Sequence, residues 1–112
     1  MSGERPVYLR LRDMIVEAIL DRRIREGEAL PSVRSFAADQ GANPLTVAKA
    51  YQTFQEDGIV TVRRGIGLFV AAGAVERLRA GERRRFLDEE WPRVAATMRR
   101  LELDPADLIG HD

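Results

Sequence analysis

The chain has 112 residues, of which 45% are hydrophobic, so it can bury the core of one small domain with an appendage and is not a disordered protein. It has no cysteine, which excludes disulfides and thiolate metal sites. Its first five residues lack the apolar segment of a signal peptide, and no apolar run approaches the ~20 residues of a membrane span, so we expect a cytoplasmic protein with no membrane partner. Because 18 Lys and Arg balance 18 Asp and Glu, any affinity for nucleic acid must come from local basic clusters.

The first predicted element is a supporting helix. Apolar residues recur at helical steps over residues 6–23, and a proline stands at the first position, where the helix needs no backbone N–H. The segment 24–29 carries Gly27 among charged residues, which predicts a connection. We expect Ile24 and Leu30 to anchor the two ends of this connection in the core.

Two short helices joined by a glycine turn form the centre of the sequence. Ser32 is a good N-cap for a helix over residues 32–40, and Gly41 supplies the turn. Asn43 is a good N-cap for a second helix over residues 44–57, which begins with a proline and is followed by a glycine. Helices joined by a turn of about four residues have the geometry of a DNA-reading helix–turn–helix. The second helix would be the reader.

A β-hairpin follows these helices. Residues 58–62 form a β-branched run, residues 63–67 a basic glycine turn, and residues 68–70 a return strand. We therefore predict a mainly α fold with a small β-hairpin, which is a winged helix–turn–helix. Its DNA-binding domain would span residues 1–71, and a helical dimerisation region would span residues 72–112.

A long helix with an apolar seam is predicted over residues 74–102. The seam residues are spaced as in a heptad repeat: Leu87, Trp91, Val94, Met98 and Leu101. A single helix cannot bury this seam against itself, so a partner helix and hence a homodimer are implied. Pro92 either kinks one helix, which we favour, or starts a second helix after Trp91.

A stub helix is predicted at the C-terminal end. Asp104 can cap it, Pro105 suits its first position, and Gly110 can end it. We expect Leu108 on this stub to belong to the dimer interface. Because no further domain is visible, an effector would bind at the dimer interface, or between it and the winged domain, near Trp91.

Several motifs resemble the GntR family of bacterial transcriptional regulators. They lie in the family's order within residues 6–71, at positions 30–34, 43–51, 58–60 and 65–70. The C-terminal part is similar to the YtrA subfamily, whose members dimerise through two helices and lack a large effector-binding domain. The resemblance implies a sequence-specific regulator that binds a palindromic operator in double-stranded DNA as a homodimer, and we expect a repressor.

The resemblance also implies roles for individual residues. Arg34 corresponds to the family's base-contacting arginine, and Thr46 corresponds to a threonine that contacts a DNA phosphate. Gly67 corresponds to the wing glycine that lets the backbone approach the minor groove. The same helices and wing bring further candidates to the DNA: Ser32, Asn43, Pro44, Leu45, Lys49, Arg63, Arg64 and Gly65.

Each candidate also has a purely structural interpretation. Asn43 is first of all a helix cap, Lys49 is equally well a solvated charge, and the arginines of a hairpin tip are solvated on most proteins. Trp91 fits a dimer anchor better than a cofactor platform.

The sequence departs from the family pattern at three positions. The connection after the first helix usually carries a glycine and a proline, where this chain has Arg22 and Glu26. Leu45 is apolar where many relatives are polar, and an apolar side chain in the major groove can touch a thymine methyl. The departures at Arg22 and Glu26 concern the shape of the connection, and the departure at Leu45 concerns which DNA site is preferred.

Two other functions are compatible with the sequence. The chain could be a truncated relative of a larger GntR regulator. It could also be a winged-helix module that binds a protein partner, and the neutral net charge favours this second alternative. We expect no enzyme and no cofactor, because no catalytic constellation is present. No metal is expected either, because the lone His111 has no partner at ligand spacing.

Overall fold

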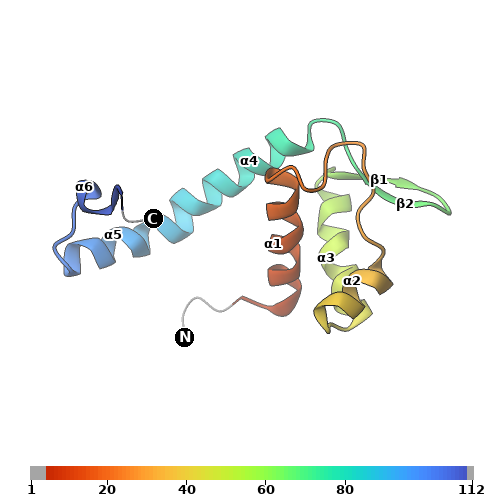
Figure 1. Ribbon diagram of the computed structural model, residues 1–112, viewed down its shortest axis with the longest axis horizontal. Helices are drawn as coiled ribbons and strands as arrows, with labels where there is room; N and C mark the ends of the chain where they lie inside the picture. Colours follow the sequence, from red (N-terminus) through yellow and green to blue (C-terminus); the bar gives the residue numbers. More distant parts are fainter. Residues whose placement is uncertain (1–4, 111–112) are drawn as a thin grey trace. The chain divides into compact units, whose positions relative to one another are not determined.

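The computed structural model describes residues 5–110, which fall into two compact units, Met1–Arg79 and Ala80–Asp112. Unit 1 contains, in chain order, α1 (Val7–Leu20), α2 (Val33–Gln40), α3 (Pro44–Glu56), β1 (Val60–Arg63), β2 (Gly67–Val70) and the beginning of α4 (Ala74–Arg85). Figure 1 shows α1 and α3 side by side and the hairpin extending away from the helices. The predicted fold class, mainly α with a small β-hairpin, is confirmed.

The core of unit 1 lies where the three helices meet the base of the hairpin. Its largest fully buried side chains are Phe54, Ile19, Val47 and Val70. Tyr51 is also buried, and its hydroxyl donates a hydrogen bond of 2.8 Å to the carbonyl of Pro31, the residue that precedes the Ser32 cap of α2. Burial raises the pKa of Tyr51 to about 12, so this hydroxyl remains a donor at neutral pH.

The caps of the two central helices are those the sequence predicts. The Ser32 hydroxyl accepts a hydrogen bond from the Ser35 N–H at 3.0 Å, and the Asn43 side chain accepts one from the Leu45 N–H at 2.8 Å. Gly41 ends α2 in the left-handed region with φ 62°. These local signals fix where each helix of the helix–turn–helix begins.

The first helix is shorter than predicted. It ends at Leu20 instead of residue 23, because Arg22 adopts φ 64° and the Arg23 N–H donates back to the Ala18 carbonyl at 2.8 Å. This is the reversal that usually places glycine after a helix. Arg22 thus adopts the left-handed backbone conformation that glycine favours, which explains why the family pattern has glycine at this position.

The connection after α1 is more ordered than a plain loop. Gly27 donates to the Val70 carbonyl and Leu30 to the Leu68 carbonyl, each at 2.8 Å, and Val70 donates back to the carbonyl of Glu28 at 2.8 Å. The segment therefore pairs with β2 through an isolated antiparallel bridge between Ala29 and Phe69. The sequence analysis identified the connection but not this pairing.

Unit 2 contains the end of α4, the π-helical segment η1 (Phe86–Glu90), α5 (Trp91–Arg100) and α6 (Pro105–Leu108). The backbone stays helical from residue 74 to residue 100, so the expected single helix is confirmed and a break after Trp91 does not occur. Its end at residue 100 is slightly earlier than predicted. The irregularity takes the form of a π turn, in which the Trp91 N–H donates to the Phe86 carbonyl. Pro92 follows directly, and because proline has no N–H it removes one backbone hydrogen bond inside this continuous helix, next to the π turn.

The stub helix has the predicted cap. The Asp104 carboxylate accepts from the Ala106 and Asp107 N–H groups, and the Asp107 carboxylate accepts from the Asp104 N–H at 2.9 Å, which is a complete capping box. The helix ends at Leu108, and Gly110 follows with φ 94°. Figure 1 shows α6 folded back along α5.

Candidate nucleic-acid interface

The outer face of α3 is the first part of the candidate interface. Val47, Ala50 and Phe54 bury the opposite face completely, and Leu45 leaves 79% of its surface exposed directly after the N-terminal proline. Leu45 therefore contributes little to the core of unit 1. Its position fits contact with an apolar group of a bound partner.

Lys49 lies one turn further along this face, but its ammonium does not project freely. Its Nζ stands 4.2 Å from the ring centroid of Tyr8 on α1, which is a cation–π contact. Such a contact at an exposed site is worth about 0.5–1 kcal/mol, so a phosphate or a base can compete for the ammonium. The structure thus gives Lys49 an alternative contact that the sequence did not reveal.

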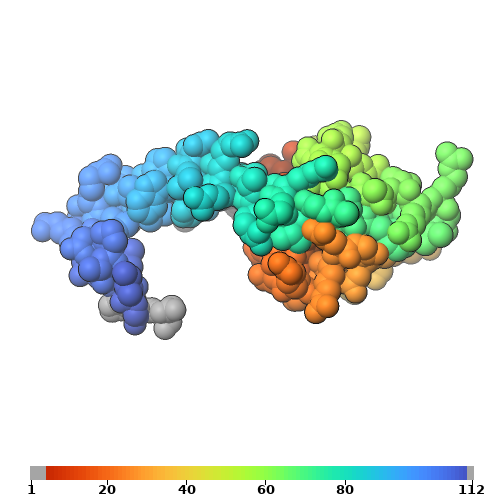
Figure 2. Space-filling view, turned by 90° about the horizontal axis from the view of Figure 1, so that it is seen from above, coloured from red at the N-terminus to blue at the C-terminus, as the bar shows by residue number. Residues whose placement is uncertain are grey.

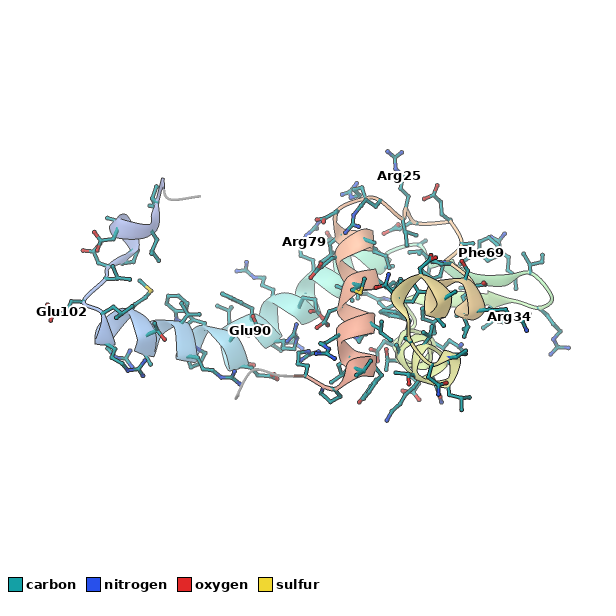
Figure 3. The ribbon with its side chains drawn as sticks, turned by 60° about the horizontal axis from the view of Figure 1, so that its bottom comes forward. Arg25, Arg34, Phe69, Arg79, Glu90 and Glu102 are labelled. Atoms are coloured by element: carbon teal, nitrogen blue, oxygen red, sulfur yellow. The ribbon has the colours of Figure 1, made fainter. Side chains whose placement is uncertain are left out.

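The N-terminal ends of α2 and α3 form the second part. Ser32, Asn43 and Pro44 are exposed there, and both capping side chains use an oxygen to close the first turn. Arg34 is exposed in the first turn of α2, and Figure 3 shows it on the side of the domain that carries the hairpin. Thr46 is half-buried in the first turn of α3. The positive ends of both helix dipoles favour an anion at this surface.

The wing is the third part. The Ile66 N–H donates to the Arg63 carbonyl at 2.9 Å, which closes the turn between the strands. Gly65 and Gly67 have φ of 77° and 145°, which L side chains rarely adopt. Figure 2 shows the hairpin, in light green, projecting from the body of unit 1. A projecting hairpin with an exposed Arg64 at its turn can reach a neighbouring groove of a duplex.

The two wing arginines differ in their surroundings. The guanidinium of Arg63 lies 4.0 Å from the ring centroid of Phe69 on the opposite strand, so stacking holds it against the hairpin. Arg64 stands in the exposed turn. Arg63 is therefore preorganised along the strand, whereas Arg64 is the side chain at the tip.

Some exposed residues on these surfaces were not among the sequence candidates, and Ile66 and Gln52 are two of them. Ile66 is 73% exposed at the wing tip, between the two glycines. Gln52 is exposed on the outer face of α3, two turns after Leu45, and its amide donates to Glu56 at 3.4 Å. The seven-residue spacing from Leu45 could have identified Gln52, and the glycines on either side could have identified Ile66.

Most of the residues predicted for the dimer interface keep an exposed apolar surface in unit 2. Trp91 and Val94 are 40% and 39% exposed, and three more are exposed by about half or more: Leu87, Leu101 and Leu108. Met98 differs, since only 8% of it is exposed in a single chain. Its burial does not require a second copy, whereas the other side chains leave a face without a partner.

A glutamate ties the α1–α2 connection to α4. The Glu26 carboxylate accepts hydrogen bonds from the N–H groups of Gly73 and Val75, each at 3.0 Å. These bonds and the nearby Arg22 charge hold the pKa of Glu26 below its usual value. The second departure from the family pattern therefore has a structural role, as a cap on α4.

Other kinds of site find no support in the part of the chain that the structure describes. Residues 5–110 contain no group of three or more His, Asp or Glu side chains that could hold a metal ion. Within the same residues no helix is both long and apolar enough to cross a bilayer. His111 lies outside the described residues.

Two helices in a helix–turn–helix, a core-facing supporting helix and a projecting hairpin define a winged helix–turn–helix protein. Comparison with known families agrees, since residues 7–70 match the model of the bacterial regulatory proteins of the gntR family. The chain belongs to the GntR family.

Individual relatives are similar over the same region. The HTH-type transcriptional regulator YhcF of Bacillus subtilis (strain 168) is 36% identical over 73 residues, which make up 65% of this chain and 60% of YhcF. The HTH-type transcriptional repressor YtrA of the same organism is 35% identical over 77 residues, or 69% of this chain and 59% of YtrA. The matches thus span about 60% of the length of these relatives.

Solved structures extend the similarity into the C-terminal part. A GntR-family transcriptional regulator from Bacteroides thetaiotaomicron is 30% identical with a TM-score of 0.69, covering 92% of this chain and 89% of that one. YtrA from Sulfolobus acidocaldarius, a GntR-family transcription factor, is 26% identical with a TM-score of 0.60, covering 88% and 96%. The similarity thus includes the helical region after the wing.

Proposed function

We propose that this protein is a sequence-specific DNA-binding transcriptional regulator, with α3 in the major groove and the wing in the adjacent minor groove. One observation carries the proposal: α3 buries one face completely in the core and presents an outer face beginning with the 79% exposed Leu45. Arg34 in the first turn of α2 and Arg64 in the turn of the wing supply exposed positive charge in a chain whose net charge is zero.

We further propose that the protein acts as a homodimer on a palindromic operator. The support is the exposed apolar face of unit 2, in which Trp91 is the largest side chain. Apolar faces rich in aromatic residues are typical of interface cores. Two-fold symmetry then places two half-sites about one helical turn apart, or ~34–36 Å.

The sign of regulation is proposed from a relative. YtrA of Bacillus subtilis is a transcriptional repressor and is 35% identical over 77 residues. We infer that this chain also represses, by occupying an operator that a polymerase needs, and that it does so in the cytoplasm, where bacterial DNA lies.

A second candidate is a protein-binding winged helix. It is favoured by three exposed apolar side chains on the surfaces assigned to DNA, namely Leu45, Val62 and Ile66. A protein partner would cover these side chains, and the zero net charge does not oppose it. The arginines at the wing and on α2 fit DNA better.

Selection from a random DNA pool at two salt concentrations tests these functions. We expect enrichment of a palindromic motif whose half-sites lie one turn apart, and an affinity that falls as salt rises. Binding that enriches no motif and disappears at the higher salt would contradict a sequence-specific regulator. That outcome would favour the protein-binding module.

A further inference from the structure

The tip of the wing carries an apolar side chain between two glycines. Ile66 is 73% exposed, and Gly65 and Gly67 stand on either side of it. Nothing lies within 4 Å of the position that a Cβ would occupy on either glycine. Within the segment 65–67 the isoleucine is therefore the one residue with a side chain larger than hydrogen, and the end of the hairpin is narrow.

The backbone of the turn keeps Ile66 away from the core. Its N–H donates to the Arg63 carbonyl at 2.9 Å, and Arg63 pairs with Gly67 across the two strands. Figure 1 shows this end of the hairpin extending away from the helices of unit 1. Among the described residues, neither the buried core nor the apolar side chains packed against it include Ile66. An aliphatic side chain in this position gains free energy only when a partner covers it.

Positive charge stands behind the apolar tip. The Arg63 guanidinium lies 4.0 Å from the ring centroid of Phe69, which holds it along the strands, and Arg64 directly precedes Gly65 in the exposed turn. Residues 59–71 contain no Asp or Glu. In a DNA minor groove the phosphates line the walls and the base edges form the floor. A basic hairpin with an apolar tip matches this order, with arginines at the walls and isoleucine at the floor.

The floor of the minor groove distinguishes base pairs by one group. The groove is ~6 Å wide and ~7.5 Å deep, so it admits a narrow tip. An A·T pair presents only acceptors there, whereas a G·C pair adds the 2-amino donor of guanine. An isoleucine side chain offers this amino group no acceptor, and covering an unpaired donor is unfavourable. Contact with Ile66 therefore disfavours G·C.

We infer that Ile66 is a specificity-determining residue, which enters the minor groove beside the site of α3 and excludes G·C from one position there. This rests on the proposed function, in which the wing binds that groove. Since A·T and T·A present the same acceptors in the minor groove, the position should accept both orientations equally. The operator would thus carry an A·T preference outside the part that α3 reads in the major groove.

The test places single G·C pairs through the flanks of the selected operator, and then inosine·C pairs at the sensitive position. Inosine keeps the major-groove edge of guanine and lacks its 2-amino group, so it isolates the minor groove. The proteins are the unmodified chain, Ile66→Ala, Ile66→Leu and Val7→Ala. Val7 is the control, because it is a β-branched residue, 47% exposed, on α1 and outside the wing.

We expect the unmodified protein to bind the A·T and inosine·C versions with similar affinity and the G·C version about tenfold more weakly. In Ile66→Ala, whose side chain is too short to cover the floor, the difference should fall to about twofold or less. Ile66→Leu and Val7→Ala should keep it. A preference that persists in Ile66→Ala would overturn the inference. A penalty that inosine does not relieve would also overturn it, because the penalty would then arise in the major groove.

The outcomes separate this inference from the proposed function. If the unmodified protein selects a motif but tolerates G·C at every flanking position, the regulator stands and the inference fails. If it selects no motif, both fail together. Because Ile66 is exposed, Ile66→Ala should change the free energy of unfolding by less than about 0.5 kcal/mol, and urea unfolding checks that a lost preference is not a lost fold. If Ile66→Ala leaves every DNA affinity unchanged, Ile66 does not contact DNA, and the result favours a protein partner at the wing tip.

Discussion

Single residues explain where this chain departs from the GntR pattern. Arg22 stands at φ 64° after α1, a position that suits glycine, and Glu26 caps α4 where the family usually has proline. Both departures alter the connection that precedes α2 without altering the helix–turn–helix.

The Arg22→Gly variant should be more stable than the Arg22→Ala variant. An L residue in the left-handed region costs about 1–2 kcal/mol, and glycine avoids this cost at the price of a more flexible unfolded chain, so we expect a net gain of about 1 kcal/mol over Arg22→Ala. The alanine variant is the matched control, since both variants lose the guanidinium. Urea unfolding monitored by circular dichroism measures the difference, and equal stabilities would contradict the assignment of strain to Arg22.

Glu26 makes stability depend on pH in a defined direction. The hydrogen bonds from Val75 and Gly73 lower its pKa in the folded state, so the carboxylate contributes stability that is present above the unfolded pKa of about 4.3. This contribution is lost as the pH falls through the lower folded pKa. The stability difference between the unmodified protein and Glu26→Gln should therefore be largest near pH 7 and shrink between pH 5 and pH 3. Thermal unfolding across that range measures it, and a constant difference would refute it.

Arg34 and Arg64 should have different effects on DNA binding. An arginine that reads a guanine contributes about 1–3 kcal/mol of discrimination, so Arg34→Ala should relax specificity at one base position. Arg64→Ala should weaken operator and random DNA alike and lower the slope of affinity against salt, because it removes a phosphate contact. Fluorescence anisotropy with both DNAs at several salt concentrations separates the two. Equal losses for both variants on both DNAs would contradict this division of roles.

Among the helices and strands, capping residues predicted the helix starts correctly, whereas contacts between distant parts of the chain were not predicted. Ser32, Asn43 and Asp104 predicted their helix starts correctly, because a capping side chain bonds to N–H groups two or three residues away. The pairing of the α1–α2 connection with β2 joins residues far apart in the chain, and charged residues around Gly27 carry no strand signal. The sequence predicted the two strands of the wing but not the pairing of the α1–α2 connection with β2.

In the candidate interface, too, the sequence predicted the features set by a local motif and missed the contacts between distant residues. The helix–turn–helix motif located Arg34 and Leu45 on exposed surfaces, as the structure has them. The contact of Lys49 with Tyr8 depends on how α1 packs on α3, and the burial of Met98 depends on the reversal after α5, so neither follows from residue spacing. Which residues touch DNA remains a prediction.

The start of α2 and the middle of α3 are joined by the Tyr51 hydroxyl, so Tyr51→Phe should loosen the helix–turn–helix as an element. The substitution keeps the ring that stacks on Phe36 at 6.1 Å but leaves the Pro31 carbonyl without this donor. We expect a loss of about 1–3 kcal/mol in the free energy of unfolding. Tyr8→Phe is the control, because it keeps the ring beneath Lys49, and it should change stability by less than about 0.5 kcal/mol. Similar losses in the two variants would argue against the Pro31 bond.

At the scale of the whole molecule, sequence reading and dimerisation are assigned to different units. Unit 1 carries the surfaces that face DNA in the proposal, and unit 2 carries the exposed apolar face. A regulator of zero net charge gains little non-specific affinity from electrostatics, so binding both half-sites together becomes the main source of operator affinity. Dimerisation should therefore control binding.

Trp91→Ala tests this dependence. A buried tryptophan at the centre of an interface contributes about 2 kcal/mol or more, so the dimer dissociation constant should rise by about 30-fold or more. Operator binding at nanomolar protein should weaken accordingly, while affinity for an isolated half-site stays unchanged, because α3 and the wing lie in unit 1. Val7→Ala, which removes an exposed apolar side chain of unit 1, should change neither quantity. Analytical ultracentrifugation and DNA binding at matched concentrations measure both, and a Trp91→Ala protein that remains dimeric would place the interface elsewhere.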